Sequence, residues 1–192
     1  MKVSCSKTAL VSGVRTVYKA VSQKATNLVL SGILVETTAD GLRLVAYDLD
    51  LGIETFIPVQ VEREGSFVFP AKQFADITGN LPHSEVILDY SESAGSVDVI
   101  SGRTHFSVKT MPAKNFPELP ELVAGKTWSM SEPELRKMIR KTAIATSTDT
   151  NRSYLMGISV EADEDGVSMV ATDSFRLANR NVEYSTGLTG KI

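Results

Sequence analysis

Residues 32–48, with the sequence GILVETTADGLRLVAYD, align without a gap with residues 157–173, GISVEADEDGVSMVATD. Nine of the seventeen positions are identical, where chance would give roughly one. The same offset of 125 residues also places Ser6 on Ser131, Leu10 on Leu135 and Arg15 on Arg140. Residues 2–57 and 127–182 are therefore two copies of one structural unit.

The repeated unit has the pattern of a strand, a helix and three further strands. A short strand over residues 2–5 precedes Ser6, which favours the N-cap position of a helix, and apolar residues then recur at helical spacing up to Val21. Strands are predicted at about 29–37, 42–47 and 52–58, with a hairpin signal at Asp40-Gly41. In the second copy, Ser131 is the predicted N-cap and Pro133 lies in the first turn.

The middle of the chain follows the same order without obvious sequence identity. A strand over 66–69 leads into a short helix that Pro70 opens and Gly79 ends, and strands are predicted near 85–90, 96–100 and 104–111. The chain thus holds three units, each of about 62 residues. Three prolines lie between residues 111 and 125, so we expect one domain over 1–120 and the start of a second over 121–192. The fold class is α+β with antiparallel sheets.

The composition excludes several classes of protein and site. The chain has 192 residues, of which 42% are hydrophobic and 22% charged, as in an ordinary globular protein. One cysteine and two histidines cannot supply a Cys/His zinc site, and no metal site is predicted. A single cysteine, the absence of a signal-peptide pattern and the lack of a long apolar run lead us to expect a cytoplasmic protein.

Charge is unevenly distributed along the chain. The net charge is −3, yet no acidic residue precedes Glu36, whereas Arg15 and Lys19 stand one helical turn apart in that stretch. A second basic cluster over residues 136–141 lies in a predicted helix and includes Arg140. An acidic protein can present such a basic face to a polyanion. On charge alone, solvated helix faces are the favoured explanation of the clusters.

Several short motifs occur in order within the repeat. The most specific is residues 170–178, VATDSFRLA; the others are NLVLSGI at 27–33, FPAK at 69–72, SGR at 101–103 followed by FS at 106–107, FPEL at 116–119 and YLMG at 154–157. With these motifs, the chain resembles the family of bacterial DNA polymerase III beta subunits, the sliding clamps, over essentially its whole length.

The resemblance implies a ring around duplex DNA, in which helices line the channel and antiparallel sheets form the outer wall. Two full-length subunits would close head to tail as a homodimer, slide on DNA without sequence specificity and tether the replicative polymerase. It implies as partners duplex DNA, the polymerase alpha subunit, the clamp loader delta subunit and other proteins with a clamp-binding motif. It implies neither a catalytic site nor a cofactor. Three units in a fold whose domains take two lead us to expect about half of a clamp subunit.

The resemblance also implies DNA-contacting residues. Family contacts correspond to Lys24, Lys72, Asp149, Ser153 and Tyr154. Asp149 and Ser153 depart from the residue types common there, and Arg152 is a local substitute. The basic helices add Arg15 and Arg140, since lysine and arginine contacts to phosphate carry no sequence information and permit sliding.

A second implied site is the groove in which partner proteins dock a short peptide. In this chain it corresponds to six residues: Leu155, Thr172, Ser174, Phe175, Arg176 and Leu177. Apolar walls with an aromatic side chain suit a few buried peptide anchors. Phe175 stands where family members often carry histidine or tyrosine. The alternative interpretation is that Leu155 and Leu177 are ordinary core residues of strands.

Two other functions stay open at this point. Asp48, Asp50 and Asp173 would be the carboxylates of a nuclease-like or polymerase-like enzyme, although turn capping is the favoured role of Asp48 and Asp173. A scaffold that binds only peptides is the third hypothesis. Of the remaining candidates, we expect His105 to face outward, Cys5 to be a small core residue, and Trp128 and Met130 to lie on a strand.

Overall fold

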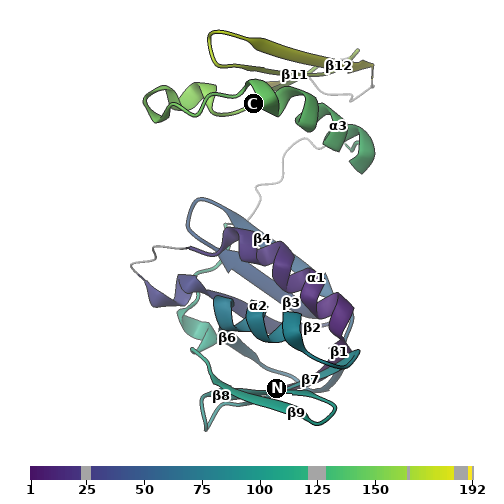
Figure 1. The fold of residues 1–192 in the computed structure, drawn as a ribbon, viewed down its shortest axis with the longest axis vertical. Coiled ribbons are helices and arrows are strands. Elements are labelled where there is room, and N and C mark those ends of the chain that lie inside the picture. The colour runs from purple at the N-terminus through teal and green to yellow at the C-terminus, as the bar shows by residue number, and fades with distance from the viewer. Residues whose placement is uncertain (23–26, 121–128, 164, 184–189, 192) are drawn as a thin grey trace. The chain divides into compact units, whose positions relative to one another are not determined.

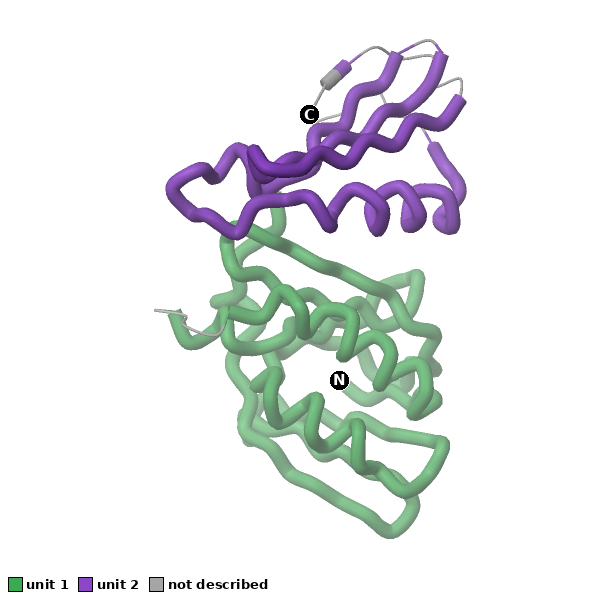
Figure 2. The backbone as a smooth tube through the Cα atoms, turned by 45° about the horizontal axis from the view of Figure 1, so that its top comes forward, with its two compact units in different colours: residues 1–121 green, residues 122–192 purple. Residues whose placement is uncertain are grey.

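The computed structural model describes residues 1–22, 27–120, 129–163, 165–183 and 190–191. The chain divides into two compact units, Met1–Glu121 and Leu122–Ile192, which Figure 2 shows in different colours. Each unit combines helices with antiparallel sheets, so the predicted α+β class is confirmed. Within the described ranges, no helix is both long and apolar enough to cross a membrane.

The first unit contains two sheets and two helices (Figure 1). The five-stranded sheet has the order β5-β1-β7-β8-β9, and the four-stranded sheet has the order β4-β3-β2-β6. The strands are β1 (Lys2–Ser6), β2 (Gly32–Thr38), β3 (Gly41–Tyr47), β4 (Gly52–Ile57), β5 (Gln60–Arg63), β6 (Ser66–Pro70), β7 (Glu85–Ser91), β8 (Ser96–Ser101) and β9 (Thr104–Lys109). The α-helices are α1 (Lys7–Val17) and α2 (Ala71–Asn80).

The first strands of the two repeats in this unit are exchanged between the sheets. β1 pairs with β5 and β7, which lie in the sheet of the second repeat, and β6 pairs with β2 in the sheet of the first. Each sheet is therefore completed by a strand from the other repeat. This exchange explains why two strand–helix–three-strand units make one domain.

The main core lies between the two sheets and the two helices. Leu10 and Val14 of α1, Leu44 of β3, Leu88 of β7 and Phe74 of α2 are fully buried in it. Gly13 of α1 faces the four-stranded sheet, where a side-chain carbon would stand 2.9 Å from Ile57 and 3.0 Å from Leu44. The missing side chain thus lets α1 approach the sheet closely. α1 and α2 contact each other, and Figure 1 shows them side by side.

The second unit is a single repeat, consisting of α3 (Glu132–Thr142) and a sheet with the order β12-β11-β10-β13. Its strands are β10 (Ser159–Ala162), β11 (Gly166–Thr172), β12 (Leu177–Glu183) and β13 (Gly190–Lys191). Glu161 pairs with Lys191 in the register in which Glu36 pairs with Ser66, so β13 sits on β10 as β6 sits on β2. The short 3₁₀ helices agree as well: η1 (Tyr18–Ala20) corresponds to η4 (Ala143–Ala145), and η2 (Leu28–Ser31) to η5 (Thr150–Leu155).

Several details differ from the predicted elements. Residues 28–31 form η2 rather than the start of a strand, α1 gives way to η1 after Val17, and the separate strand β5 was not predicted. Met130 is not in a strand, whereas the equivalent segment of the first copy, β1, pairs with β5 and β7. Trp128 lies outside the described residues. Ser6 caps α1 as predicted, its Oγ accepting a hydrogen bond of 3.1 Å from the Ala9 amide.

Candidate nucleic-acid and peptide interfaces

Helix α1 presents a basic, acid-free face to solvent. Its apolar residues turn inward, which leaves Arg15 and the following Lys19 of η1 exposed. Neither side chain forms an ion pair with any acidic residue in the described part of the chain. Lys7 belongs to the same face, although its Nζ donates a hydrogen bond of 2.5 Å to the Leu81 carbonyl. Lys72 is exposed in the first turn of the neighbouring α2.

Helix α3 repeats this arrangement in the second unit, with its charges sorted along the axis. Its acids occupy the first turn, where Glu132 pairs with Arg136 and Glu134 lies 3.4 Å from Arg180. Arg140 lies in the last turn and is exposed, as is Lys141 after it. Acids near the N-terminus and bases near the C-terminus complement the helix dipole. The last turn thus carries positive charge that no described acid neutralises.

The segment of η5 holds four predicted DNA contacts. Asp149 is its N-cap: Oδ1 accepts a hydrogen bond of 3.0 Å from the Asn151 amide, and Oδ2 accepts one of 3.0 Å from Arg152 Nε. The side-chain hydrogen bond from Arg152 is the main reason that the pKa of Asp149 lies below its ordinary value. Ser153 is exposed and Tyr154 is 78% exposed. Tyr154 therefore does not pack on a strand, and its ring is free to meet a ligand.

Five of the groove residues lie in and around the turn between β11 and β12: Thr172 ends β11, Leu177 begins β12, and Ser174, Phe175 and Arg176 lie between them. Asp173 organises this turn, since its Oδ1 accepts hydrogen bonds of 3.0 Å from the amides of Phe175 and Arg176 and its Oδ2 accepts one of 2.9 Å from Arg176 Nε. These bonds, the one from the Phe175 amide first, lower the pKa of Asp173. Thr172 Oγ1 donates to the Arg176 carbonyl at 2.8 Å. The exposed turn is thus held by internal hydrogen bonds.

Two apolar side chains of this set, Phe175 and Leu177, are exposed, and Leu155 is half-buried. Phe175 is 92% and Leu177 is 66% exposed, and Leu155 lies in η5 instead of a strand. The interpretation of Leu155 and Leu177 as strand core residues is therefore wrong. A hydrogen bond of 3.1 Å from Arg152 Nη1 to Ser174 Oγ joins η5 to the turn, so the structure connects the predicted DNA segment with the predicted groove.

Two of the three carboxylates considered for an enzyme, those of Asp48 and Asp173, cap turns. Asp48 Oδ1 accepts hydrogen bonds of 3.0 Å from the Asp50 amide and 2.7 Å from the Leu51 amide, and these bonds lower its pKa. Asp173 has the same geometry in the second unit, so the predicted turn-capping role of both is confirmed. Within the described residues, no group of three or more His, Cys, Asp or Glu side chains is placed to hold a metal ion.

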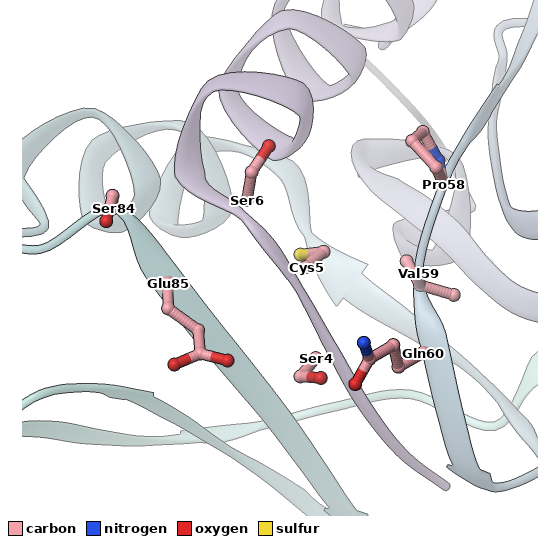
Figure 3. A pocket seen from close by; sticks show the side chains of 8 residues that line it. All are labelled: Ser4, Cys5, Ser6, Pro58, Val59, Gln60, Ser84 and Glu85. Carbon is pink, nitrogen blue, oxygen red and sulfur yellow. The ribbon is translucent and has the colours of Figure 1, made fainter.

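A separate cavity of about 480 Å³ lies beside Cys5 (Figure 3). It is lined by residues from β1, β7 and the segment around β5, namely Ser4, Cys5, Ser6, Pro58, Val59, Gln60, Ser84 and Glu85. The thiol is buried, and this desolvation raises its pKa to about 11. Cys5 belongs to the main buried cluster, so it is a core residue as predicted, and a protonated thiol is a weak nucleophile. His105 faces outward, also as predicted, with its Nε2 3.4 Å from Asp98.

Sequence reasoning did not find every feature of these surfaces. Lys24 lies outside the described residues. The hydrogen bond between Arg152 and Ser174 joins residues 22 positions apart and has no signal in the sequence. Lys7 had a signal, because it stands two helical turns before Arg15 on the same face.

The family models for the DNA polymerase III beta subunit match both units. The model for its N-terminal domain matches residues 1–120, and the model for its central domain matches residues 129–191. The beta sliding clamp of Synechococcus elongatus is 35% identical over 93% of this chain, and that of Bacillus subtilis is 31% identical over 95%. The alignments cover 48% and 50% of those proteins, so the chain spans about half the length of the curated relatives it matches.

Solved structures agree with this result. The sliding clamp from Bacillus subtilis matches with a TM-score of 0.92 and 30% sequence identity, covering 100% of this chain and 53% of that one. A Pseudomonas aeruginosa sliding clamp, described as bound to griselimycin, also has a TM-score of 0.92, at 26% identity and the same coverage. The fold, the internal repeat, the sequence motifs and the family models all indicate the same family. The chain belongs to the DNA polymerase III beta subunit family, the bacterial sliding clamps.

Proposed function

We propose that this chain supplies a DNA-facing surface and part of the partner-binding surface of a sliding clamp. In the complete assembly, two subunits close head to tail around duplex DNA and slide along it without reading its sequence. The clamp tethers the replicative polymerase and other proteins, is loaded by the clamp loader and has no catalytic site of its own. The curated relatives about twice as long as this chain provide the context for the complete ring.

One observation carries the DNA-binding part of the proposal. Two helical segments related by the internal repeat, α1 with η1 and α3, both expose arginine and lysine side chains that no described acid neutralises, and the repeat places Arg15 on Arg140. The basic residue of strands β2, β3, β4 and β6 is neutralised, since Arg43 pairs with Glu36 at 3.1 Å and Glu54 at 3.0 Å. A polyanion is therefore attracted to the helices rather than to that sheet.

Phosphate contacts suit a sliding protein because they are the same at every base pair. They supply affinity without sequence information, whereas hydrogen bonds to base edges would hold the protein at particular sites. The long side chains of Arg15 and Lys19 reach phosphate from a helix surface. Tyr154, exposed in η5, adds an aromatic ring beside Arg152 for stacking or backbone contact.

The peptide-binding part of the proposal rests on the turn 172–177. Phe175 and Leu177 expose apolar side chains on a turn that is held by the hydrogen bonds of Asp173. A preorganised apolar surface loses little entropy on binding, so a short motif of a polymerase, clamp loader or repair protein finds anchors there. The family resemblance assigns the remainder of the groove to a domain beyond these residues, so we expect weak binding by the 192-residue chain.

The DNA-binding part is tested by the salt dependence of duplex binding. We expect weak, sequence-independent binding of the chain to a labelled duplex. The affinity should fall as salt rises, and the variant Arg15→Ser/Lys19→Ser should reduce the magnitude of the slope of log affinity against log salt by about 2. The control Lys2→Ser/Lys109→Ser removes the same charge from strands whose lysines already bond Glu62 and the Ala94 carbonyl. An equal change in the control would contradict the proposed surface.

The ring itself is tested with the native protein on closed circular duplex DNA. We expect retention on the circle at high salt and release once the circle is cut, since a topological link does not depend on affinity. Equal retention on linear and circular DNA would contradict encirclement. A nuclease activity that survives purification and is lost in Asp48→Asn would instead favour the enzyme hypothesis.

A further inference from the structure

The guanidinium of Arg152 is held between two elements of the second unit. Its Nε donates a hydrogen bond of 3.0 Å to Oδ2 of Asp149, the N-cap of η5, and its Nη1 donates one of 3.1 Å to Oγ of Ser174, in the turn between β11 and β12. Arg152 also lies at the kink within η5, with a non-helical φ of −120° and a ψ of 60°. One side chain therefore joins the kink of η5 to the neighbouring turn.

Ser174 has a backbone conformation that serine seldom adopts. Its φ is 80°, in the left-handed region, where the side-chain carbon of most residues is crowded by the backbone. Glycine would form the same turn without this strain. The feature that serine has and glycine lacks is the hydroxyl, and this hydroxyl accepts the hydrogen bond from Arg152. The strained residue thus supplies the contact between the turn and η5.

The corresponding turn of the first unit forms without such a contact. The offset of 125 places Asn27 at the position of Arg152 and Leu49 at the position of Ser174. Leu49 has a φ of 82°, so the two turns share the same conformation, but its side chain has no hydrogen-bonding group. Asn27 caps η2 instead, its Oδ1 accepting a hydrogen bond of 3.2 Å from the Val29 amide. The bond between Arg152 and Ser174 is therefore not what gives the turn its conformation.

Arg152 keeps donors for a ligand while both of these bonds are made. A guanidinium has five N–H groups, of which Nε and one on Nη1 are used. Its Nη2 meets no acceptor among the residues that the structure describes, and the side chain is 39% exposed. A phosphate oxygen at Nη2 would accept a charge-assisted hydrogen bond without displacing Asp149 or Ser174. The guanidinium thus has room for a third partner.

We propose that Arg152 is a positioning residue that couples DNA binding to partner docking. A DNA phosphate bound at Nη2 fixes the guanidinium, and the guanidinium holds the turn 173–176 through Ser174. This turn carries Phe175, the exposed aromatic anchor of the peptide groove. The inference rests on the proposed function, because duplex DNA and the partner peptide are its two ligands.

The coupling is positive because each ligand restricts the same side chain. An arginine that a phosphate has already ordered loses little further freedom when it holds Ser174, and the reverse is equally true. Thermodynamic linkage requires that DNA strengthens peptide binding by the same factor by which the peptide strengthens DNA binding. Since a single exposed hydrogen bond transmits the effect, we expect a factor of about two to ten.

The proposal is tested by hydrogen exchange at the amides of Phe175 and Arg176, both of which donate to Asp173 Oδ1. NMR measures their exchange in the 192-residue chain at low salt, with and without a saturating short duplex. We expect the duplex to slow the exchange of both amides at least about twofold. In Ser174→Gly, which suits the backbone but lacks the hydroxyl, the duplex should leave their exchange unchanged.

Two controls separate this effect from a general response to DNA. Ser168→Ala removes a hydroxyl of β11 whose bond goes to Asn179, so the effect of the duplex on the turn should persist. The Asp50 and Leu51 amides, which donate to Asp48 in the first unit, are an internal control, because that turn has no arginine contact. Equal slowing in both turns would overturn the inference.

A double-mutant cycle provides a second readout, the affinity for the labelled duplex. Ser174→Gly should weaken duplex binding about twofold in the unmodified chain but not in the Arg152→Ala background, because the hydroxyl acts only through the guanidinium. Additive losses would overturn the proposal, since they would mean that Ser174 acts independently of Arg152.

The outcomes distinguish this inference from the function on which it rests. A duplex that binds without changing exchange at Phe175 and Arg176 would overturn the coupling alone. A chain that binds no duplex even at low salt would overturn both the DNA-binding function and the coupling. Arg152 already pairs with Asp149, so the salt slope should depend on Arg15 and Arg140 and stay nearly unchanged in Ser174→Gly.

Discussion

Arg152 donates a hydrogen bond of 3.1 Å from Nη1 to Oγ of Ser174, while its Nε donates one of 3.0 Å to the carboxylate of Asp149. The same guanidinium thus ties the N-cap of η5 to the turn between β11 and β12. Two surfaces with different proposed ligands, duplex DNA and a partner peptide, share this link. A change at Arg152 is therefore expected to reach both of them.

Arg152→Ala should loosen η5 and the neighbouring turn without unfolding the unit. The lost bonds are partly exposed, so we expect a loss of stability of about 1 kcal/mol or less. Hydrogen exchange should accelerate in residues 150–156 and 173–176. Arg152→Lys retains the positive charge but loses the planar guanidinium that donates to both Asp149 and Ser174. This variant should therefore accelerate hydrogen exchange nearly as much as Arg152→Ala. Unchanged exchange in both segments would show that the link has no mechanical role.

Arg140 and Arg136 provide a matched pair on α3 for the DNA surface. Arg136 pairs with Glu132, whereas Arg140 is exposed in the last turn with no described acidic partner. Arg140→Ser should lower the salt slope of duplex binding by about 1, and Arg136→Ser should lower it less. Anisotropy titrations over a series of salt concentrations measure both. Equal slopes for the two variants would contradict the assignment of Arg140.

Phe175 is expected to contribute to binding and not to stability. Its side chain is 92% exposed, so Phe175→Ala should change the free energy of unfolding by less than about 0.5 kcal/mol. Met138, fully buried in the same unit, is the contrast: Met138→Ala should cost about 2–5 kcal/mol. Urea denaturation measures both. A large loss of stability in Phe175→Ala would mean that the ring is a packing element.

The turn at Asp173 should resist acid. Its pKa is lowered because the charged carboxylate accepts backbone and arginine hydrogen bonds, so the stabilisation is complete above the ordinary carboxyl pKa and is lost as the pH falls through the lower pKa of the folded state. NMR titration of the carboxyl carbon should show ionisation below the usual range of about 3.9. Asp173→Asn should remove the pH dependence of the protection factors of the Phe175 and Arg176 amides, that is, of their exchange rates relative to the unfolded chain at the same pH. An ordinary titration would contradict the bonding pattern.

Cys5 should be unreactive in the folded protein. Burial raises the pKa of its thiol from 9.0 to about 11, so the protonated form stabilises the fold below pH 9 and this contribution is lost as the pH rises toward 11. Near pH 8, alkylation by iodoacetamide should be at least about a hundredfold slower than in urea-unfolded protein. A similar rate in both states would show that the thiol is accessible.

The sequence carried more information about the repeat than about the pairing of its strands. The matches at an offset of 125 residues predicted α3 from α1 and β10–β12 from β2–β4, because the same apolar periodicity must bury the same faces. It did not indicate that β1 joins β7 while β6 joins β2. Strand exchange depends on which sheet edges remain unpaired once both helices have packed on the sheets. Contacts between residues far apart in the chain determine which edges these are.

The candidate sites likewise combine features that the sequence predicted with features that only the structure shows. The motif at 170–178 identified the turn, and helical spacing placed Arg15 and Arg140 on exposed faces. The motif did not reveal that the carboxylate of Asp149 accepts a hydrogen bond from Arg152, or that Leu177 is exposed. Hydrogen bonding and burial depend on the three-dimensional surroundings of a side chain, which a local motif does not specify.

By itself, the sequence determined the repeat, the order of elements, the α+β class and the family. Only the tertiary structure decided that Phe116 and Leu119 pack on the outer face of the four-stranded sheet of the first unit. The physical reason is that local patterns specify which faces of a helix or strand are apolar, whereas the segment that covers a face is selected by shape. Here that shape is the missing side chain of Gly52, which leaves the space that Leu119 fills.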